Sequence, residues 1–137
     1  MIEITYDKLI PENITDSTMK DTNGAVVTFL GTTRDTFEGK KVVHLEYEAY
    51  ETMALQKLTE ISEESKYKYN ISDISISHRI GVVGVGEISL VVAVASPHRA
   101  EAFQACNELV DRLKEVVPIW KKEIYSDGSR WVGSENI

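Results

Sequence analysis

The sequence predicts an α+β fold, in which a mixed or antiparallel sheet packs against two main helices. Two observations support this prediction. Apolar side chains recur at helical spacing in residues 51–68 and again between Ser96 and Pro118. The segments around these helices are short and either alternate in polarity or are rich in β-branched residues, which is typical of strands. The chain has 137 residues and contains no linker or repeat, so we expect residues 1–137 to form a single domain.

The N-terminal part is expected to contain a short strand at residues 2–6 and a polar stretch, residues 10–23, that can hold a short helix. The first firm strand is residues 25–30, because its β-branched and aromatic side chains are typical of a buried strand. Gly31 ends this strand. The polar segment from Thr32 to Lys41 is expected to be a loop.

The middle of the chain predicts a strand at residues 43–49, a helix at 51–68 and a second strand at 73–80. In the first strand the alternation places four side chains on the core side, namely Val43, Leu45, Tyr47 and Ala49. The helix is predicted from an apolar side formed by Ala54, Leu55, Leu58 and Ile61. We interpret Gly81 to Gly86 as a tight turn that leads into a strand at residues 88–95, which is apolar on both faces and therefore central.

The last long helix is expected to begin with Ser96 as its N-cap and Pro97 at its first position. Its apolar stripe is Phe103, Cys106, Val110, Leu113 and Val117. Pro118 ends the helix, because the residue before a proline avoids helical backbone angles. A short strand at residues 119–125 and a turn at Asp127-Gly128 complete the expected elements.

The composition excludes several classes of function. The net charge of -7 argues against a nucleic-acid-binding protein, which would carry a basic face. No uninterrupted apolar run is long enough to span a membrane, and the N-terminus does not look like a signal peptide. A single cysteine, Cys106, fits a reducing cytoplasm. Four basic residues nevertheless lie close together between Arg112 and Lys122, which suggests a small anionic ligand.

His98 and Arg99 are candidates for an anion site, because they fall in the first turn of the predicted helix. Cations are disfavoured at a helix N-terminus by about 0.3–1 kcal/mol each, so an arginine and a histidine there make sense if an anion sits between them. An Arg99 side chain that simply extends into solvent explains the pattern equally well. Arg34, on a loop that follows a buried strand, is a weaker candidate of the same kind.

Lys114 and Lys121 are the candidate reactive side chains. Lys114 lies at the edge of the helix's apolar stripe, and Lys121 follows the bulky pair Ile119-Trp120. A lysine beside apolar bulk can lose proton affinity and take part in catalysis. The alternative, which spacing alone favours, is that both side chains cover apolar surface with their stems and keep their charge in water.

Other features point to structure rather than chemistry. His78 falls on an apolar strand face and is expected to be a hydrogen-bonded core histidine. Cys106 lies on the apolar stripe and is expected to be a buried, inert thiol. The scattered histidines and single cysteine show no metal-ligand spacing, so we expect no metal and no cofactor.

Seven segments, in order along the chain, resemble the MoaE family, the large catalytic subunit of molybdopterin synthase. They are Gly24 to Arg34, Leu45 to Tyr50 with Met53, His78 to Gly81, Ser96 to Arg99 with Ala102 and Phe103, Leu113-Lys114, Val117 to Glu123, and Asp127 to Trp131. Each segment alone is weakly specific, but the ordered set covers nearly the whole chain.

The resemblance implies an α/β hammerhead fold and a sulfurtransferase of molybdenum cofactor biosynthesis. The substrate would be cyclic pyranopterin monophosphate. The sulfur donor would be a small ubiquitin-like subunit, similar to MoaD, whose C-terminal Gly-Gly ends in a thiocarboxylate. The product would be the dithiolene that later holds molybdenum. The chain would form a homodimer within a heterotetramer.

The resemblance also implies roles for individual residues. Lys114 and Lys121 would be catalytic, because they flank the partner's tail, polarise the thiocarboxylate and handle protons. Substrate and tail would be bound by Thr32, Thr33, Arg34, His98, Arg99, Lys122 and Glu123, with His98 and Arg99 coming from a neighbouring protomer. Thr32 stands where many members have a basic residue, which predicts a less positive pocket.

Two other functions stay open at the level of the sequence. A non-catalytic anion-binding scaffold subunit of the same fold would not need Lys114 and Lys121. A phosphate-ester enzyme that acts alone would need a metal-binding carboxylate cluster or a clear nucleophile, and the sequence shows neither.

Overall fold

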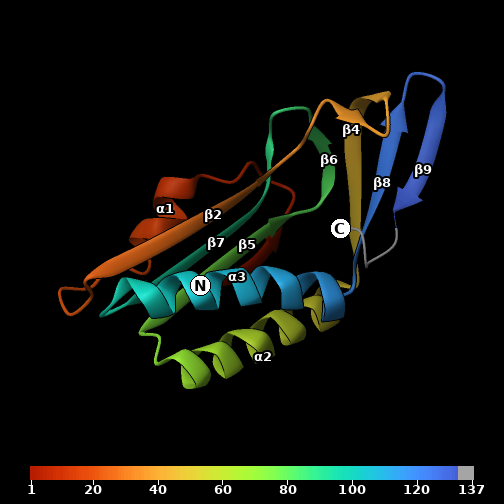
Figure 1. Cartoon of the computed structure of the whole chain (residues 1–137). Coiled ribbons are helices and arrows are strands. Elements are labelled where there is room, and N and C mark those ends of the chain that lie inside the picture. The colour runs from red at the N-terminus through yellow and green to blue at the C-terminus, as the bar shows by residue number, and fades with distance from the viewer. Residues whose placement is uncertain (133–137) are drawn as a thin grey trace.

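A computed structural model describes residues 1–132 and shows two sheets and three helices in this part of the chain (Figure 1). In chain order the elements are β1 (Ile2–Thr5), α1 (Pro11–Asp16), β2 (Ala25–Thr32), β3 (Thr36–Phe37), β4 (Lys40–Ala49), α2 (Glu51–Tyr69), β5 (Asp73–Arg79), β6 (Gly81–Gly84), β7 (Ile88–Ser96), α3 (Arg99–Val116), β8 (Ile119–Tyr125) and β9 (Gly128–Val132). The predicted α+β class is confirmed. None of the helices within residues 1–132 is long and apolar enough to cross a membrane.

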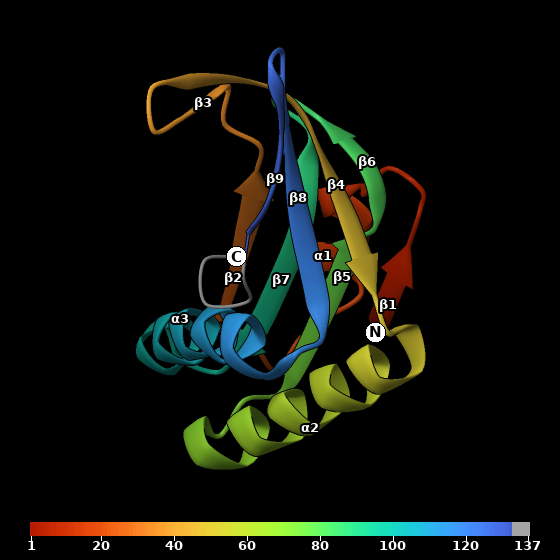
Figure 2. The same cartoon turned by 90° about the vertical axis from the view of Figure 1, so that its right-hand side faces the viewer.

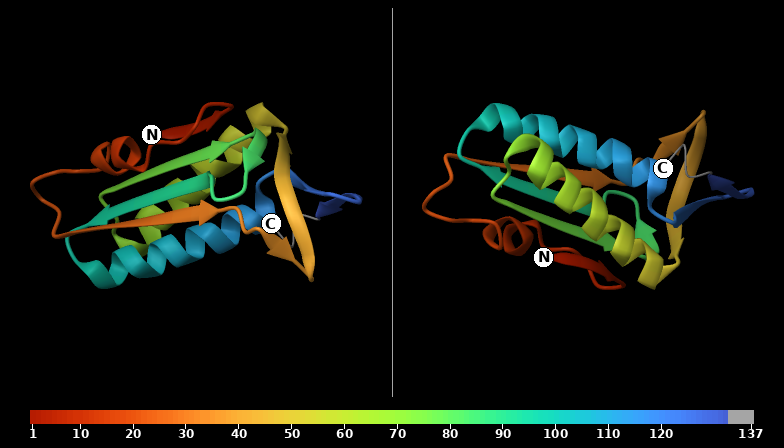
Figure 3. Two further views of the ribbon diagram at one scale, coloured as in Figure 1. Left: turned by 90° about the horizontal axis from the view of Figure 1, so that it is seen from above. Right: turned by 90° about the horizontal axis from the view of Figure 1, so that it is seen from below.

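The first sheet has the strand order β1-β5-β7-β2 and is antiparallel except for the parallel pair β1 and β5. Helices α2 and α3 cover one face of this sheet, and α1 packs on the other (Figures 1 and 3). β7 lies in the middle, and its apolar side chains are buried on both faces, as the sequence predicts. β2 lies at one edge, so its outer backbone edge has no neighbouring strand in residues 1–132.

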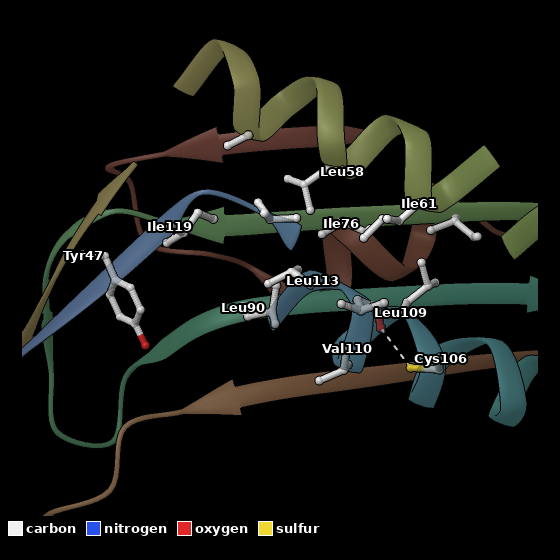
Figure 4. Packing of buried hydrophobic residues seen from close by; sticks show 14 of the residues in the cluster. Tyr47, Leu58, Ile61, Ile76, Leu90, Cys106, Leu109, Val110, Leu113 and Ile119 are labelled. Atoms are coloured by element: carbon white, nitrogen blue, oxygen red, sulfur yellow. Dashed lines mark hydrogen bonds between the residues drawn. The ribbon is translucent and has the colours of Figure 1, made fainter. Parts of the chain in front are cut away.

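The main core lies between this sheet and the two long helices (Figure 4). Leu58 and Ile61 of α2 meet Leu109 and Leu113 of α3 above Ile76 of β5, and all five side chains are buried. The sequence predicts Leu55 on the buried side of α2, and this is wrong, because Leu55 is 37% exposed. The predicted stripe of α3 also needs a correction, because Phe103 is 61% exposed while Ala102 takes the inward position. In both cases the exposed residue directly follows a buried alanine, and one step along a helix of 3.6 residues per turn rotates a side chain by about 100°, out of the buried face.

The second sheet has the order β3-β4-β8-β9. A fifth strand, β6, also pairs antiparallel with β4, on the edge opposite β8. It stands at one end of the first layer, where β4 and β8 run side by side (Figure 2). The glycine-rich segment is therefore not only a turn. Gly81 to Gly84 forms β6, and the turn follows at Val85 and Gly86. Gly81 has a φ of +84°, which lets the chain leave the first sheet and enter the second.

The inward face of β4 also differs from the prediction. Val43 is 51% exposed, whereas Val42 is 3% exposed and occupies the inward position. The pairing between β4 and β8 shifts register between Val42 and His44, as expected of a β-bulge. Leu45 and Tyr47 point inward as predicted. Residues 36–37, inside the predicted loop, form β3, and the predicted turn at Asp127-Gly128 leads into β9.

The start of α3 is a further correction. Ser96 is the last residue of β7 and pairs with Ala25, so it is not the N-cap, and Pro97 is not the first helical residue. The helix begins at Arg99 with His98 in the N-cap position, and no side chain caps it. The Ser96 hydroxyl donates to the carbonyl of His98 instead of capping the helix. The cap signal fails because sheet pairing with β2 holds Ser96 in an extended conformation.

Candidate active site

Most of the predicted site residues meet in a cavity of about 60 Å³ between the end of β2 and the inner face of the second sheet. Its lining residues are Thr32, Thr33, Arg34, Thr36, Phe37, Val42, Leu45, Tyr47, Lys121 and Glu123. The cavity forms because the inward side chains of β4 and β8 alternate along paired strands, so that Lys121 lies opposite Tyr47 and Glu123 lies opposite Leu45. The site therefore combines one lysine, one arginine and one carboxylate with four hydroxyls, those of three threonines and of Tyr47.

Lys121 is the lysine inside this cavity. Its pKa is lowered, chiefly because burial disfavours the ammonium form. Glu123 opposes this effect by raising the pKa, while Arg34, Lys114 and Arg130 add smaller lowering effects. A lysine whose charge is destabilised in this way gives up its proton more readily than a lysine in water does.

Lys114 approaches Lys121 through a short joint between helix and strand. It lies in the last turn of α3, where the helix dipole favours a cation. Only Val117 and Pro118 separate α3 from β8, and both ends of this joint are tied by backbone hydrogen bonds. The Val117 amide donates to the carbonyl of Leu113 at 3.1 Å, and the Tyr50 amide donates to the carbonyl of Pro118 at 3.2 Å. The two predicted catalytic lysines are thus brought together.

Glu123 is 2% exposed, although its type is rarely buried. One of its oxygens, Oε2, accepts a hydrogen bond from the Tyr125 hydroxyl at 3.0 Å. The other, Oε1, has no hydrogen-bond partner in the described part of the chain, and the same is true of the buried hydroxyl of Thr33 in this cavity. Both residues line the cavity, so these two atoms are available to polar groups of a ligand there.

Arg34 lies at the rim of the cavity. Its guanidinium stacks on Phe37, with 5.9 Å from Cζ to the ring centroid, and Arg130 stacks on the same ring at 4.8 Å. Thr32 is exposed at the end of β2, and Thr33 is held by backbone bonds to the β6–β7 turn. Arg130 is also ion-paired with Glu38 at 3.1 Å, so Arg34 is the arginine of this pair whose charge is available to a phosphate or carboxylate.

Lys122 is not part of the cavity. Strand alternation places it on the opposite face of β8 from Lys121 and Glu123. There its ammonium lies 5.5 Å from the centroid of the Trp131 ring, and it pairs across the strands with Glu46. A contact between Lys122 and a ligand in the cavity is therefore not supported by this chain alone.

His98 and Arg99 lie at the far end of α3 from the cavity (Figure 1). Fifteen residues separate Arg99 from Lys114, which corresponds to about 22 Å along the helix. Both side chains are exposed. Within one chain the predicted anion site at the helix start and the lysine site are thus separate.

Sequence reasoning missed several residues of the site. Tyr47 was assigned only to the core, and Phe37, Tyr125 and Arg130 were not singled out as site residues. The alternation of β8 carried a signal for Tyr125, because inward positions on a strand recur every two residues after Lys121 and Glu123. Phe37 and Arg130 lie on hairpins whose approach to each other depends on tertiary structure.

His78 and Cys106, which the sequence predicts to be structural, are both buried in the core. His78 is 2% exposed, and burial lowers its pKa to about 4, so it is neutral at physiological pH. Burial raises the pKa of Cys106 to about 11, which leaves its thiol protonated and unreactive. No group of histidine, cysteine and acidic residues within residues 1–132 is arranged to hold a metal ion.

The fold and the cavity define an α+β protein with a pocket lined by lysine, arginine and glutamate between the end of β2 and the second sheet. The chain belongs to the MoaE family of molybdopterin synthase catalytic subunits: the model of the MoaE protein matches residues 4–116. The resemblance stated from the sequence is thereby confirmed.

Curated relatives and a solved structure agree with this assignment. The molybdopterin synthase catalytic subunit of Bacillus subtilis (strain 168) is 47% identical over 133 residues, which cover 97% of this chain and 85% of the relative. The human molybdopterin synthase catalytic subunit is 42% identical, over 98% of this chain and 72% of the relative. The crystal structure of molybdopterin synthase from Staphylococcus aureus superposes with a TM-score of 0.92 at 43% identity, and the match covers 95% of both chains.

Proposed function

We propose that the chain is the catalytic subunit of a molybdopterin synthase. It transfers sulfur from the C-terminal thiocarboxylate of a small ubiquitin-like subunit to cyclic pyranopterin monophosphate and forms the dithiolene of molybdopterin. The observation that carries the proposal is the half-buried Lys121, whose pKa is lowered: it lines the cavity together with Arg34, and the charge of Lys114 acts on it from the end of α3. We also propose that it works in the cytoplasm, in keeping with its single, buried cysteine.

In this proposal the two lysines act on the partner's C-terminal tail. The Lys121 ammonium donates a hydrogen bond to the thiocarboxylate and polarises it, and its lowered pKa lets it exchange protons during transfer. Lys114 supplies the second positive charge from the end of α3. Arg34 binds an anionic part of the substrate at the rim, and the Thr33 hydroxyl, which has no partner among residues 1–132, is available to the ligand.

His98 and Arg99 complete the site only from a second copy of the chain, because about 22 Å of helix separates them from Lys114. Two α3 helices that lie antiparallel across a two-fold axis bring the start of one to the end of the other. The axis must then pass near the middle of α3, between Arg99 and Lys114, which falls at Cys106 and Asn107.

An apolar hollow of about 250 Å³ occupies that position. It is lined by residues of β2 and α3, namely Val27, Thr28, Phe29, Phe103, Cys106, Asn107 and Val110. Figure 3 shows that β2, the edge strand of the first sheet, runs beside α3. Phe103 is 61% exposed and Leu30, on the same strand as Phe29, is 41% exposed. Exposed aromatic surface beside an open strand edge is typical of a subunit interface. These features support a homodimer, which two small subunits extend to a heterotetramer.

The test is a three-component assay. Purified protein is mixed with thiocarboxylated small subunit and cyclic pyranopterin monophosphate, and dithiolene pterin is measured. Product that requires all three components is expected. Absence of product, with the small subunit shown to be thiocarboxylated and bound, would favour the non-catalytic scaffold subunit.

A further inference from the structure

The buried carboxylate of Glu123 is the starting point. Glu123 lies on the inner face of β8 between Lys121 and Tyr125, and only Tyr125 donates a hydrogen bond to it in residues 1–132. A buried carboxylate normally accepts several hydrogen bonds. Its orientation, and therefore the position of the unused oxygen Oε1, depends on this one contact.

Tyr125 is well placed to fix that orientation. Its side chain is 8% exposed and lies opposite Val42 across the strand pair, while the Lys40 ammonium lies 5.3 Å from the ring centroid. Burial, together with the hydrogen bond to Glu123, raises the pKa of Tyr125. The hydroxyl therefore keeps its proton and remains a donor throughout the physiological pH range.

We propose that Tyr125 is a positioning residue of the sulfur-transfer site, which acts through the Glu123 carboxylate to keep the Lys121 ammonium charged and oriented. This inference rests on the proposed function, because it assigns a role within that reaction. Lys121 and Glu123 lie two residues apart on β8 and therefore on the same face of the strand, so the negative charge of Glu123 lies on the same side as the positive charge of Lys121.

The charges around Lys121 explain why such a counter-charge is needed. The groups that face Lys121 are Arg34 after β2, Lys114 of α3, Arg130 of β9, the neutral Tyr47 of β4, and Glu123. The three cations lower the pKa of Lys121, and Glu123 alone among these groups raises it. Loss of an oriented Glu123 would leave Lys121 in a wholly positive surrounding, and its ammonium would lose its proton at lower pH.

The test variant is Tyr125→Phe, which keeps the ring and removes the donor. We expect kcat for sulfur transfer to fall about tenfold, the loss that follows from removing one hydrogen bond to a charged group. The KM for the small subunit should not change, and the basic limb of the kcat profile should move to lower pH. Tyr67→Phe, at a side chain that is 94% exposed, is the matched control and should behave as wild type.

A second variant separates positioning from packing. If Tyr125 acts through Glu123, then Tyr125→Phe will have no further effect on kcat in a Glu123→Gln background. An undiminished loss in that background would show that Tyr125 acts on packing and would overturn the proposal.

A measurement without turnover distinguishes this inference from the proposed function. The 13Cε resonance of Lys121 is titrated by NMR in the wild type and in Tyr125→Phe, with Lys121→Arg used for assignment. A titration at lower pH in the variant supports the inference even if the three-component assay yields nothing. Identical titrations overturn it even if the wild type is fully active.

Discussion

Combining two inactivating substitutions in one dimer is predicted to restore activity. One chain carries Lys121→Ala and the other carries Arg99→Glu. Because about 22 Å of α3 separates Arg99 from Lys114 within a chain, a working site must draw its lysines from one copy and its helix start from the other. In this mixed dimer one site then contains both substitutions, and the other contains neither.

The expected magnitude follows from counting sites. The mixed dimer should have about half of the wild-type rate, whereas each homodimer of a single variant should be nearly inactive. The two chains are co-expressed with different affinity tags, the mixed dimer is isolated on both tags in turn, and dithiolene pterin is measured in the three-component assay.

A reciprocal dimer is the control. Here one chain carries both substitutions and the other is wild type, so each shared site contains one lesion and the rate should be near zero. If this control retained about half of the activity and the first mixed dimer had none, the site would lie within one chain and the reasoning from α3 would be refuted.

Three further predictions concern single residues. Lys121→Ala should abolish sulfur transfer but leave the circular dichroism spectrum and Tm of the wild type, since the side chain is only half-buried; an unaltered rate would remove Lys121 from the mechanism. Folding lowers the pKa of His78 from 6.5 to about 4, so the unfolded chain binds the extra proton and the free energy of unfolding should fall by about 3 kcal/mol as the pH drops from 6.5 to 4. Urea titrations of wild type and His78→Gln check this, and an equal loss in both would exclude His78 as the cause. Cys106, whose pKa is raised to about 11, should resist iodoacetamide at pH 8 in the folded protein and react after denaturation, as mass spectrometry would show.

Local pattern was sufficient for the long elements. The helix predicted at residues 51–68 is α2, Glu51–Tyr69, and the strand predicted at 119–125 is β8, because periodicity and the stop at Pro118 act within a few residues. It failed where tertiary structure decides. The bulge in β4 exchanged Val42 for Val43, and pairing with β2 overrode the cap signal at Ser96. Neither event has a local sequence signature.

The site, too, has residues that the sequence could predict and residues whose roles depend on tertiary structure. The two lysines could be predicted because a known family pattern accompanies them, and the short joint at Val117 and Pro118 brings them together. The separation of Arg99 from the cavity follows from helix length once α3 is known to run without interruption from Arg99 to Val116. The alternation of β8 places Glu123 and Tyr125 on one face, but that this face is buried, and that Tyr125 holds the carboxylate, is decided by how the second sheet packs.

The two-residue joint between α3 and β8 has a mechanical consequence. Lys114 belongs to the helix that packs on the first sheet, and Lys121 belongs to the strand that forms the second. Val117 is buried, and the Pro118 carbonyl accepts a hydrogen bond from the Tyr50 amide, so the joint is held rigidly and does not act as a hinge. The relative position of the two lysines is therefore set by the fold itself, so the pair is already in place before a partner's tail enters the cavity.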